Sequence, residues 1–194
     1  MSDNSRYAHI EGRRDIVFDV NVKTILGKID AVVFDLDGTL TDSIGQILSC
    51  THTTFEYLSL PQPDDKAIMS TIGLELGEAL TSLLPEDKKH LGPSVTKDYR
   101  EIFKSRRDLQ LDTLFLGIEP LMKKLRELDI KIGYASGRSM QGIERTMNAT
   151  FLGKYCDGIC AGSEVPSKPD PTMMHILCKR LKVEESRVLG VGDS

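Results

Sequence analysis

IDAVVFDLDGTLTDS, residues 29–43, is the stretch that decides the fold. Its first six residues form an almost unbroken apolar run, which is typical of a central strand in a parallel sheet covered on both faces. Polar side chains then alternate with Leu or Gly from Asp35 to Thr41. Asp35 and Asp37 are two residues apart on an extended segment, so they point to the same side. The sequence therefore predicts a functional site at the carboxyl end of this strand.

Further apolar runs after residue 113 indicate more strands, separated by helical patterns. We predict strands over 130–135, 158–161 and 187–191, and helices over 118–128, from 139 to Met147, and over 171–181. In the last of these helices Asp170 is expected to be the N-cap and Pro171 the first helical residue. Strands that alternate with helices predict a parallel sheet with its site at the carboxyl ends. The predicted fold class is α/β, a Rossmann-like, three-layer parallel-sheet core.

Residues 44–113 show helical spacing and no strand of comparable strength. Helices are expected over 44–60, 74–84 and 95–103, with prolines between them. We predict that 44–113 is an all-helical insert in a core made of 28–43 and 114–194. Residues 1–27 would form an N-terminal extension, in which an apolar period of two over 16–22 indicates a short strand.

Composition limits the classes of function. The chain has 194 residues, of which 40% are hydrophobic and 28% charged, and its net charge is −4. This balance argues against nucleic-acid binding, which needs concentrated Lys and Arg. No apolar stretch is long enough to span a bilayer and no signal-peptide core begins the chain, so we expect a cytoplasmic protein without membrane contact. For the oligomeric state, a monomer and a homodimer are both compatible with the sequence.

The predicted strand ends carry groups suited to one reaction. Hydrolysis of a phosphate monoester is very slow without a catalyst, so an enzyme must neutralise charge and align the reacting groups. A carboxylate nucleophile needs a bridging cation such as Mg²⁺, and a second acid must serve the leaving oxygen. Candidate carboxylates, phosphate donors and an ammonium group occur at Asp35, Asp37, Ser136, Gly137, Lys168 and Asp193.

Four segments resemble, in order, the signature motifs of the haloacid dehalogenase-like hydrolases. They are FDLDGTLTDS at 34–43, IGYAS at 132–136, SKPDP at 167–171 and VGDS at 191–194. The helical insert resembles the cap of the phosphoglycolate phosphatase-like branch. Within it, residues 71–74 resemble the loop that reaches into the site of that branch.

The resemblance implies a Mg²⁺-dependent phosphatase that hydrolyses a small-molecule phosphate monoester, such as phosphoglycolate, through an aspartyl-phosphate. Asp35 would be the nucleophile and a metal ligand. Asp37 would be the general acid/base and would offer its backbone carbonyl to the metal. Asp193 would complete the Mg²⁺ site. Ser136 would bind the transferring phosphoryl group, and Lys168 would steady the nucleophile and the phosphate.

Other positions refine this prediction. The predicted phosphate- and substrate-binding set also contains Gly38, Thr39, Gly137 and Arg138. Arg138 would either bind an anionic substrate or lie at the start of a helix without a role in binding. Related phosphosugar mutases carry a histidine in the first cap helix where this chain has Ile47, which favours hydrolysis.

The end of the chain is the main departure from the family pattern. Relatives continue past the fourth motif, whereas this chain ends at Ser194. We therefore expect a truncated chain whose sheet has an exposed edge, unless something else covers it. The alternative to an enzyme is an inactive fragment with a binding role.

Overall fold

The computed structural model of the protein describes residues 27–106 and 113–192. The predicted N-terminal strand and Asp193 lie outside the described residues. The strands are β1 (Ala31–Phe34), β2 (Lys131–Ser136), β3 (Gly158–Ala161) and β4 (Val188–Val191). The α-helices are α2 (Ile44–Tyr57), α3 (Asp65–Met69), α4 (Leu76–Ser82), α5 (Gly92–Ser105), α6 (Ile118–Glu127), α7 (Met140–Ala149) and α8 (Thr172–Leu181). Short 3-10 helices cover Glu86–Leu91, Phe151–Tyr155 and Glu185–Arg187.

The four described strands form one parallel sheet in the order β3-β2-β1-β4. In the register, Ala31 of β1 lies opposite Lys131 of β2 on one side and Val188 of β4 on the other. All residues of β1 are buried, as expected of a central strand. The predicted α/β fold with a parallel sheet is confirmed.

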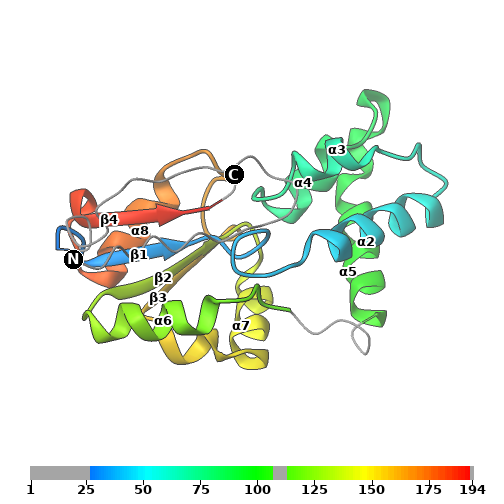
Figure 1. Ribbon diagram of the computed structural model, residues 1–194. Coiled ribbons are helices and arrows are strands. Elements are labelled where there is room, and N and C mark those ends of the chain that lie inside the picture. Colours follow the sequence, from blue (N-terminus) through cyan, green and yellow to red (C-terminus); the bar gives the residue numbers. More distant parts are fainter. Residues whose placement is uncertain (1–26, 107–112, 193–194) are drawn as a thin grey trace.

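Helices cover both faces of the sheet because the side chains of β1 alternate between them. Val32 and Phe34 face a core cluster that includes residues of α6 and α7. Ala31 and Val33 face the opposite cluster, to which α8 contributes Leu177. The result is a three-layer arrangement (Figure 1).

A separate helical group, formed by α2 to α5, lies beyond the carboxyl ends of the strands (Figure 1). It has its own core cluster of buried side chains, among them Phe55, Leu80 and Val95. The chain passes from the sheet to the helical group near Asp42 and returns near Thr113. These two connecting segments are hydrogen-bonded to each other, because the Asp42 N–H donates to the Thr113 carbonyl at 2.8 Å. The bounds of the predicted insert, 44–113, stay a prediction.

Several element boundaries differ from the predicted ones for local reasons. The first helix ends at Tyr57 instead of residue 60, because Ser59 adopts a left-handed φ of 52°. The helix predicted over 74–84 begins at Leu76, where the Glu75 carboxylate caps the N–H groups of Gly77 and Glu78. Helix α3 was not predicted at all, and it is only five residues long.

Helices α5 and α8 also begin at other residues than predicted. Helix α5 begins at Gly92, earlier than the predicted residue 95, with Pro93 in its first turn. Helix α8 begins at Thr172, one residue later than predicted. The Asp170 carboxylate still accepts a hydrogen bond from the Thr172 N–H at 2.8 Å, so the capping interaction itself is present.

Strand β4 forms an edge of the described sheet. Leu189 and Val191 are 40% and 37% exposed, which agrees with the expectation of an exposed edge. Among the described helices, none combines the length and the apolar character needed to cross a bilayer.

Candidate active site

Asp35 directly follows β1, and its carboxylate contacts a backbone N–H and an ammonium group. Its Oδ1 accepts the backbone N–H of Leu36 at 2.7 Å, and its Oδ2 lies 2.9 Å from the Lys168 ammonium group. The side chain is only 4% exposed. Burial raises the pKa of Asp35 above its usual value, and Lys168 opposes this rise without cancelling it. Asp35 is thus a buried, oriented carboxylate beside a cation.

Ser136 and Gly137 stand at the end of β2, the strand next to β1. Ser136 is fully buried, and its hydroxyl accepts the backbone N–H of Arg138 at 3.2 Å. Gly137 faces the loop before α4 so closely that a Cβ there would lie 2.6 Å from the Gly73 carbonyl oxygen. Only glycine permits this approach. The structure therefore brings the predicted 71–74 loop onto the strand end that carries Ser136.

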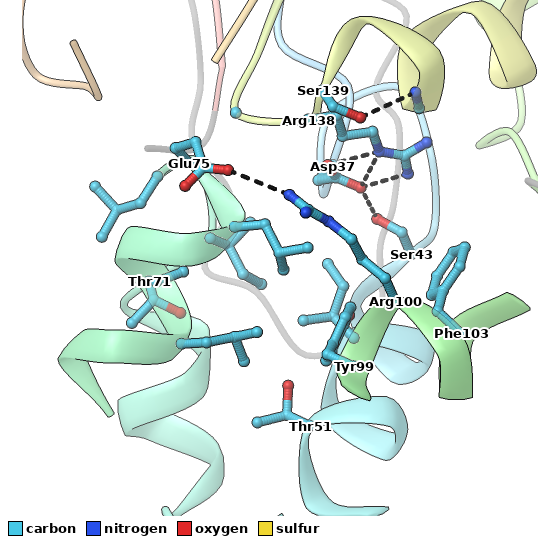
Figure 2. A pocket seen from close by; sticks show the side chains of 18 of the residues that line it. Asp37, Ser43, Thr51, Thr71, Glu75, Tyr99, Arg100, Phe103, Arg138 and Ser139 are labelled. Carbon is cyan, nitrogen blue, oxygen red and sulfur yellow. Dashed lines mark hydrogen bonds and ion pairs between the residues drawn. The ribbon is translucent and has the colours of Figure 1, made fainter. Parts of the chain in front are cut away.

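Asp37 is clamped by Arg138, which lies 101 residues further along the chain. The guanidinium donates from Nε to Oδ2 at 2.9 Å and from Nη2 to Oδ1 at 2.6 Å (Figure 2). The Ser43 hydroxyl donates to Oδ1 at 2.5 Å. Burial alone would raise the pKa of Asp37, but Arg138 and Ser43 outweigh it and lower the pKa below the usual value. Asp37 is consequently held as a carboxylate.

Arg138 is held in place by a second contact of its own. Its Nη1 donates to the Thr146 hydroxyl of α7 at 2.6 Å. The roles of Ser43 and Thr146 were missed from the sequence. Ser43 ends the first motif, so its position was a signal, whereas nothing in the sequence marks Thr146.

Gly38 and Thr39 belong to the tight turn after Asp37. Gly38 has a φ of 75°, in the left-handed region that favours glycine, and its N–H donates to the Thr41 carbonyl at 3.0 Å. The Thr39 N–H donates to the Leu36 carbonyl at 3.3 Å. This turn fixes the backbone beside Asp37. The predicted phosphate-binding role of both residues stays a prediction.

The fourth motif reaches the site at its described end. The Val191 carbonyl accepts the Asp35 N–H at 2.9 Å, and a Cβ on Gly192 would lie 3.5 Å from the Cβ of Asp35. Within residues 27–106 and 113–192, no group of three His, Cys, Asp or Glu side chains could hold a metal ion. The predicted ligands in this range offer only oxygen, from the Asp35 carboxylate and the Asp37 carbonyl. Such donors fit a hard cation such as Mg²⁺.

A cavity of about 540 Å³ lies between the helical group and the start of α7. Asp37, Ser43, Gly137 and Arg138 line it, so this part of the predicted site opens toward the helical group. Asp35, Ser136 and Lys168 are not among the residues that line it. Glu75 ties the 71–74 loop to the third motif, because its N–H donates to the Ser167 hydroxyl at 3.1 Å.

Comparison with known proteins identifies the family. The model of the haloacid dehalogenase-like hydrolase family matches residues 32–194. The chain belongs to this family. A phosphoglycolate phosphatase from Chromobacterium violaceum is 28% identical over 179 residues, which cover 87% of this chain and 78% of that protein.

Solved structures agree with the fold. A haloacid dehalogenase-like family hydrolase from Streptococcus pneumoniae superposes with a TM-score of 0.70, at 23% identity, over 87% of this chain and 77% of that one. A beta-phosphoglucomutase from Clostridium difficile superposes with a TM-score of 0.72, at 22% identity, over 86% and 77%. At these identities the likeness concerns the fold alone. The predicted haloacid dehalogenase-type hydrolase, with its similarity to phosphoglycolate phosphatases, is confirmed.

Proposed function

We propose that the protein is a Mg²⁺-dependent phosphatase that hydrolyses a small-molecule phosphate monoester through an aspartyl-phosphate on Asp35. The arrangement of Asp35 carries this proposal. Its carboxylate is buried, oriented by the Leu36 N–H, and 2.9 Å from the Lys168 ammonium group. A carboxylate held in this way is suited to attack phosphorus, while the neighbouring cation reduces repulsion between the two anions.

The proposed reaction has two steps. In the first, an Asp35 oxygen forms a bond to phosphorus, the bond to the ester oxygen breaks, and Asp37 gives a proton to the leaving alcohol. In the second, Asp37 takes a proton from a water molecule that attacks the phosphorus, and inorganic phosphate leaves Asp35. Asp37 must first take up a proton, because Arg138 and Ser43 hold it as a carboxylate. Ser136 and Lys168 would bind the phosphoryl oxygens.

Mg²⁺ would be held by the carboxylate of Asp35, the backbone carbonyl of Asp37 and Asp193. The bound ion would offset the negative charge of the phosphoryl group and the nucleophile. Burial raises the pKa of Asp35, so a cation beside it would favour the ionised form that the reaction needs.

The substrate is proposed to be a small phosphorylated metabolite of the phosphoglycolate class. The relative from Chromobacterium violaceum, named a phosphoglycolate phosphatase, supports this assignment. A phosphosugar mutase is the second candidate, since a beta-phosphoglucomutase shares the fold. Ile47 lines the cavity at the position where those mutases are expected to carry histidine, and an aliphatic side chain cannot exchange protons. Hydrolysis is therefore the better supported function.

The experiment is an assay of phosphate release from an aryl phosphate and a panel of phosphorylated metabolites, with Mg²⁺ and with EDTA. We expect turnover that needs Mg²⁺ and disappears in Asp35→Asn. Asp42→Asn is the matched control, because it makes the same isosteric change on an exposed side chain of the same loop. Wild-type protein that is folded, supplied with Mg²⁺ and still releases no phosphate would refute the proposal. A requirement for a sugar bisphosphate without net phosphate release would indicate the mutase.

A further inference from the structure

Three buried side chains with a hydroxyl group line the cavity between the helical group and α7: Ser43, Thr51 and Tyr99. The Ser43 hydroxyl donates to Asp37. Thr51 and Tyr99 are only 1% and 6% exposed, and their hydroxyls make no hydrogen bond to any residue of 27–106 and 113–192. A buried hydroxyl without a partner is unfavourable, so the contents of the cavity must supply one.

The Thr51 hydroxyl is directed differently from those of its neighbours on α2. Thr53 and Thr54 each donate to the carbonyl group four residues earlier, at 2.9 Å and 2.7 Å. This is the usual bond of a threonine inside a helix. Thr51 makes no such bond with the described residues, and Figure 2 shows its hydroxyl pointing away from α2. Because Thr51 lines the cavity, its hydroxyl is available to a ligand there.

Tyr99 of α5 offers a neutral donor to the same cavity. Its ring stacks on that of Phe103, with centroids 6.2 Å apart and an angle of 19° between the ring planes. Burial raises the pKa of Tyr99 above its usual value, and the Asp37 carboxylate adds to this rise. The phenol therefore stays protonated at neutral pH, and it both donates and accepts hydrogen bonds. The influence of Asp37 also means that Tyr99 lies within electrostatic reach of the proposed reaction centre.

These two hydroxyls make the cavity selective for what binds in it. In the protein without substrate, water molecules in the cavity can serve both groups. A substrate that fills the cavity displaces this water. It must then replace the lost hydrogen bonds or leave two buried hydroxyls unpaired, and a site of this kind discriminates strongly against a ligand that lacks the matching group.

The rest of the lining favours a neutral partner over an anion. Ile47, Leu80 and Leu83 also line the cavity, and an anion buried against apolar side chains needs a paired cation. The cations that α5 contributes to the lining are Arg100 and Lys104, and each already lies near a glutamate, at 3.9 Å and 2.6 Å. A hydroxyl group of the ligand is neutral and needs no such partner.

We propose that Thr51 and Tyr99 bind a hydroxyl group on the carbon body of the substrate, so that the substrate is a small phosphate monoester with a free hydroxyl away from the phosphate. This inference rests on the proposed function, which supplies the site for the phosphate. A hydroxyl both donates and accepts, so one such group pairs with both side chains at once. Thr51 and Tyr99 thus determine specificity and do not touch the reacting atoms.

The test measures binding to the Asp35→Asn variant, in which no turnover is expected, by isothermal titration calorimetry with Mg²⁺. The probes are pairs of an alkyl phosphate and the ω-hydroxyalkyl phosphate with the same number of carbons, over chains of two to six carbons. The series of lengths brings the terminal hydroxyl to different depths of the cavity. We expect at least one hydroxylated probe to bind about tenfold or more tightly than its alkyl counterpart, as two hydrogen bonds allow.

Two substitutions decide which side chains are responsible. Tyr99→Phe and Thr51→Val each remove one hydroxyl at nearly constant shape, and each should reduce the preference about threefold or more, while both together should bring it close to one. Thr54→Val is the matched control, because Thr54 is a buried threonine of the same helix that does not line the cavity. It should leave the preference unchanged.

Thermal unfolding separates recognition from a structural role. Tyr99→Phe and Thr51→Val break no hydrogen bond with the described residues, so both variants should melt no lower than their parent. Thr54→Val should melt lower, because it breaks the bond of 2.7 Å within α2.

Equal affinities within every pair of probes would overturn the inference, because water alone would then serve the two hydroxyls. A preference that survives the double substitution would overturn it as well. The proposed function fails in a different way, through absence of binding by every probe and absence of phosphate release by the wild-type protein, and the inference fails with it. The two failures are distinguishable because the first is a ratio of affinities and the second is a loss of all binding and turnover.

Discussion

The ion pair between Arg138 and Asp37 offers a direct test of the electrostatics of the site. The perturbation is Arg138→Met, which keeps an unbranched apolar stem and removes the guanidinium. The two side chains are only 18% and 13% exposed. Breaking a buried pair by removing one partner costs about 3–5 kcal/mol, because the other charge stays buried without compensation. Since solvent reaches part of this pair, we expect a loss of about 2–4 kcal/mol in the free energy of unfolding.

The assay is urea unfolding in buffer with EDTA at pH 7, supported by thermal unfolding. For a protein of this size each kcal/mol shifts the melting temperature by about 2–4 °C, so the variant should melt about 5–15 °C lower. The matched control is Arg187→Met. Arg187 pairs with Asp30 through the same two-contact geometry, at 2.5 and 2.7 Å, but those side chains are 43% and 44% exposed. Its loss should be a small fraction of that caused by Arg138→Met.

The effect should also depend on pH, with a sign that follows from the pKa of Asp37. In the wild-type protein this pKa is lowered below 3.8, so its contribution to stability is present above that value and is lost only as pH falls further. Without Arg138, burial dominates and the pKa of Asp37 rises above its unfolded value. The buried charge then destabilises the variant at neutral pH, and protonation relieves this as pH falls. The gap between wild type and variant should narrow from pH 7 toward pH 4.

Two results would refute this reasoning. One is an equal loss of stability in Arg138→Met and Arg187→Met, which would mean that burial of the pair is irrelevant. The other is a gap that stays constant or widens as the solution is acidified.

Three further predictions concern packing and titration. Gly137→Ala should lower stability by about 1–3 kcal/mol, because its methyl group would meet the backbone carbonyls of residues 73 and 74, and an unchanged melting temperature would contradict this. The pKa of His52 should lie above 6.5 because of its hydrogen bond with Asp65. The stability that this bond adds is therefore complete below pH 6.5 and is lost as pH rises through the pKa of His52 in the folded state. An NMR titration should show this pKa return toward 6.5 in Asp65→Asn. Leu177→Ala should lower the free energy of unfolding by about 2–5 kcal/mol, because Leu177 is fully buried between α8 and the sheet. Urea unfolding measures this loss, and the dependence of the free energy on urea concentration should stay unchanged.

The amino-acid sequence by itself determined the sheet and the place of the candidate site. The apolar run before Asp35 is buried on both faces, and such a run has few alternatives to a central parallel strand. Because parallel strands all end at one edge, the positions of Asp35 and Ser136 at the ends of their strands were enough to predict that they lie at the same edge of the sheet. Both inferences depend only on residues that are neighbours in the sequence.

The tertiary structure alone decided which charges meet and where the cavity lies. Asp37 pairs with Arg138 across 101 residues, and Thr146 fixes the far side of the same guanidinium. Nothing in the local pattern around Arg138 distinguishes that contact from a solvent-exposed arginine. The same holds for Arg100 and Arg145, which line one cavity from different helices. Such pairings depend on how the helical group sits on the sheet, and that placement results from many weak packing contacts summed over the fold rather than from any short segment of sequence.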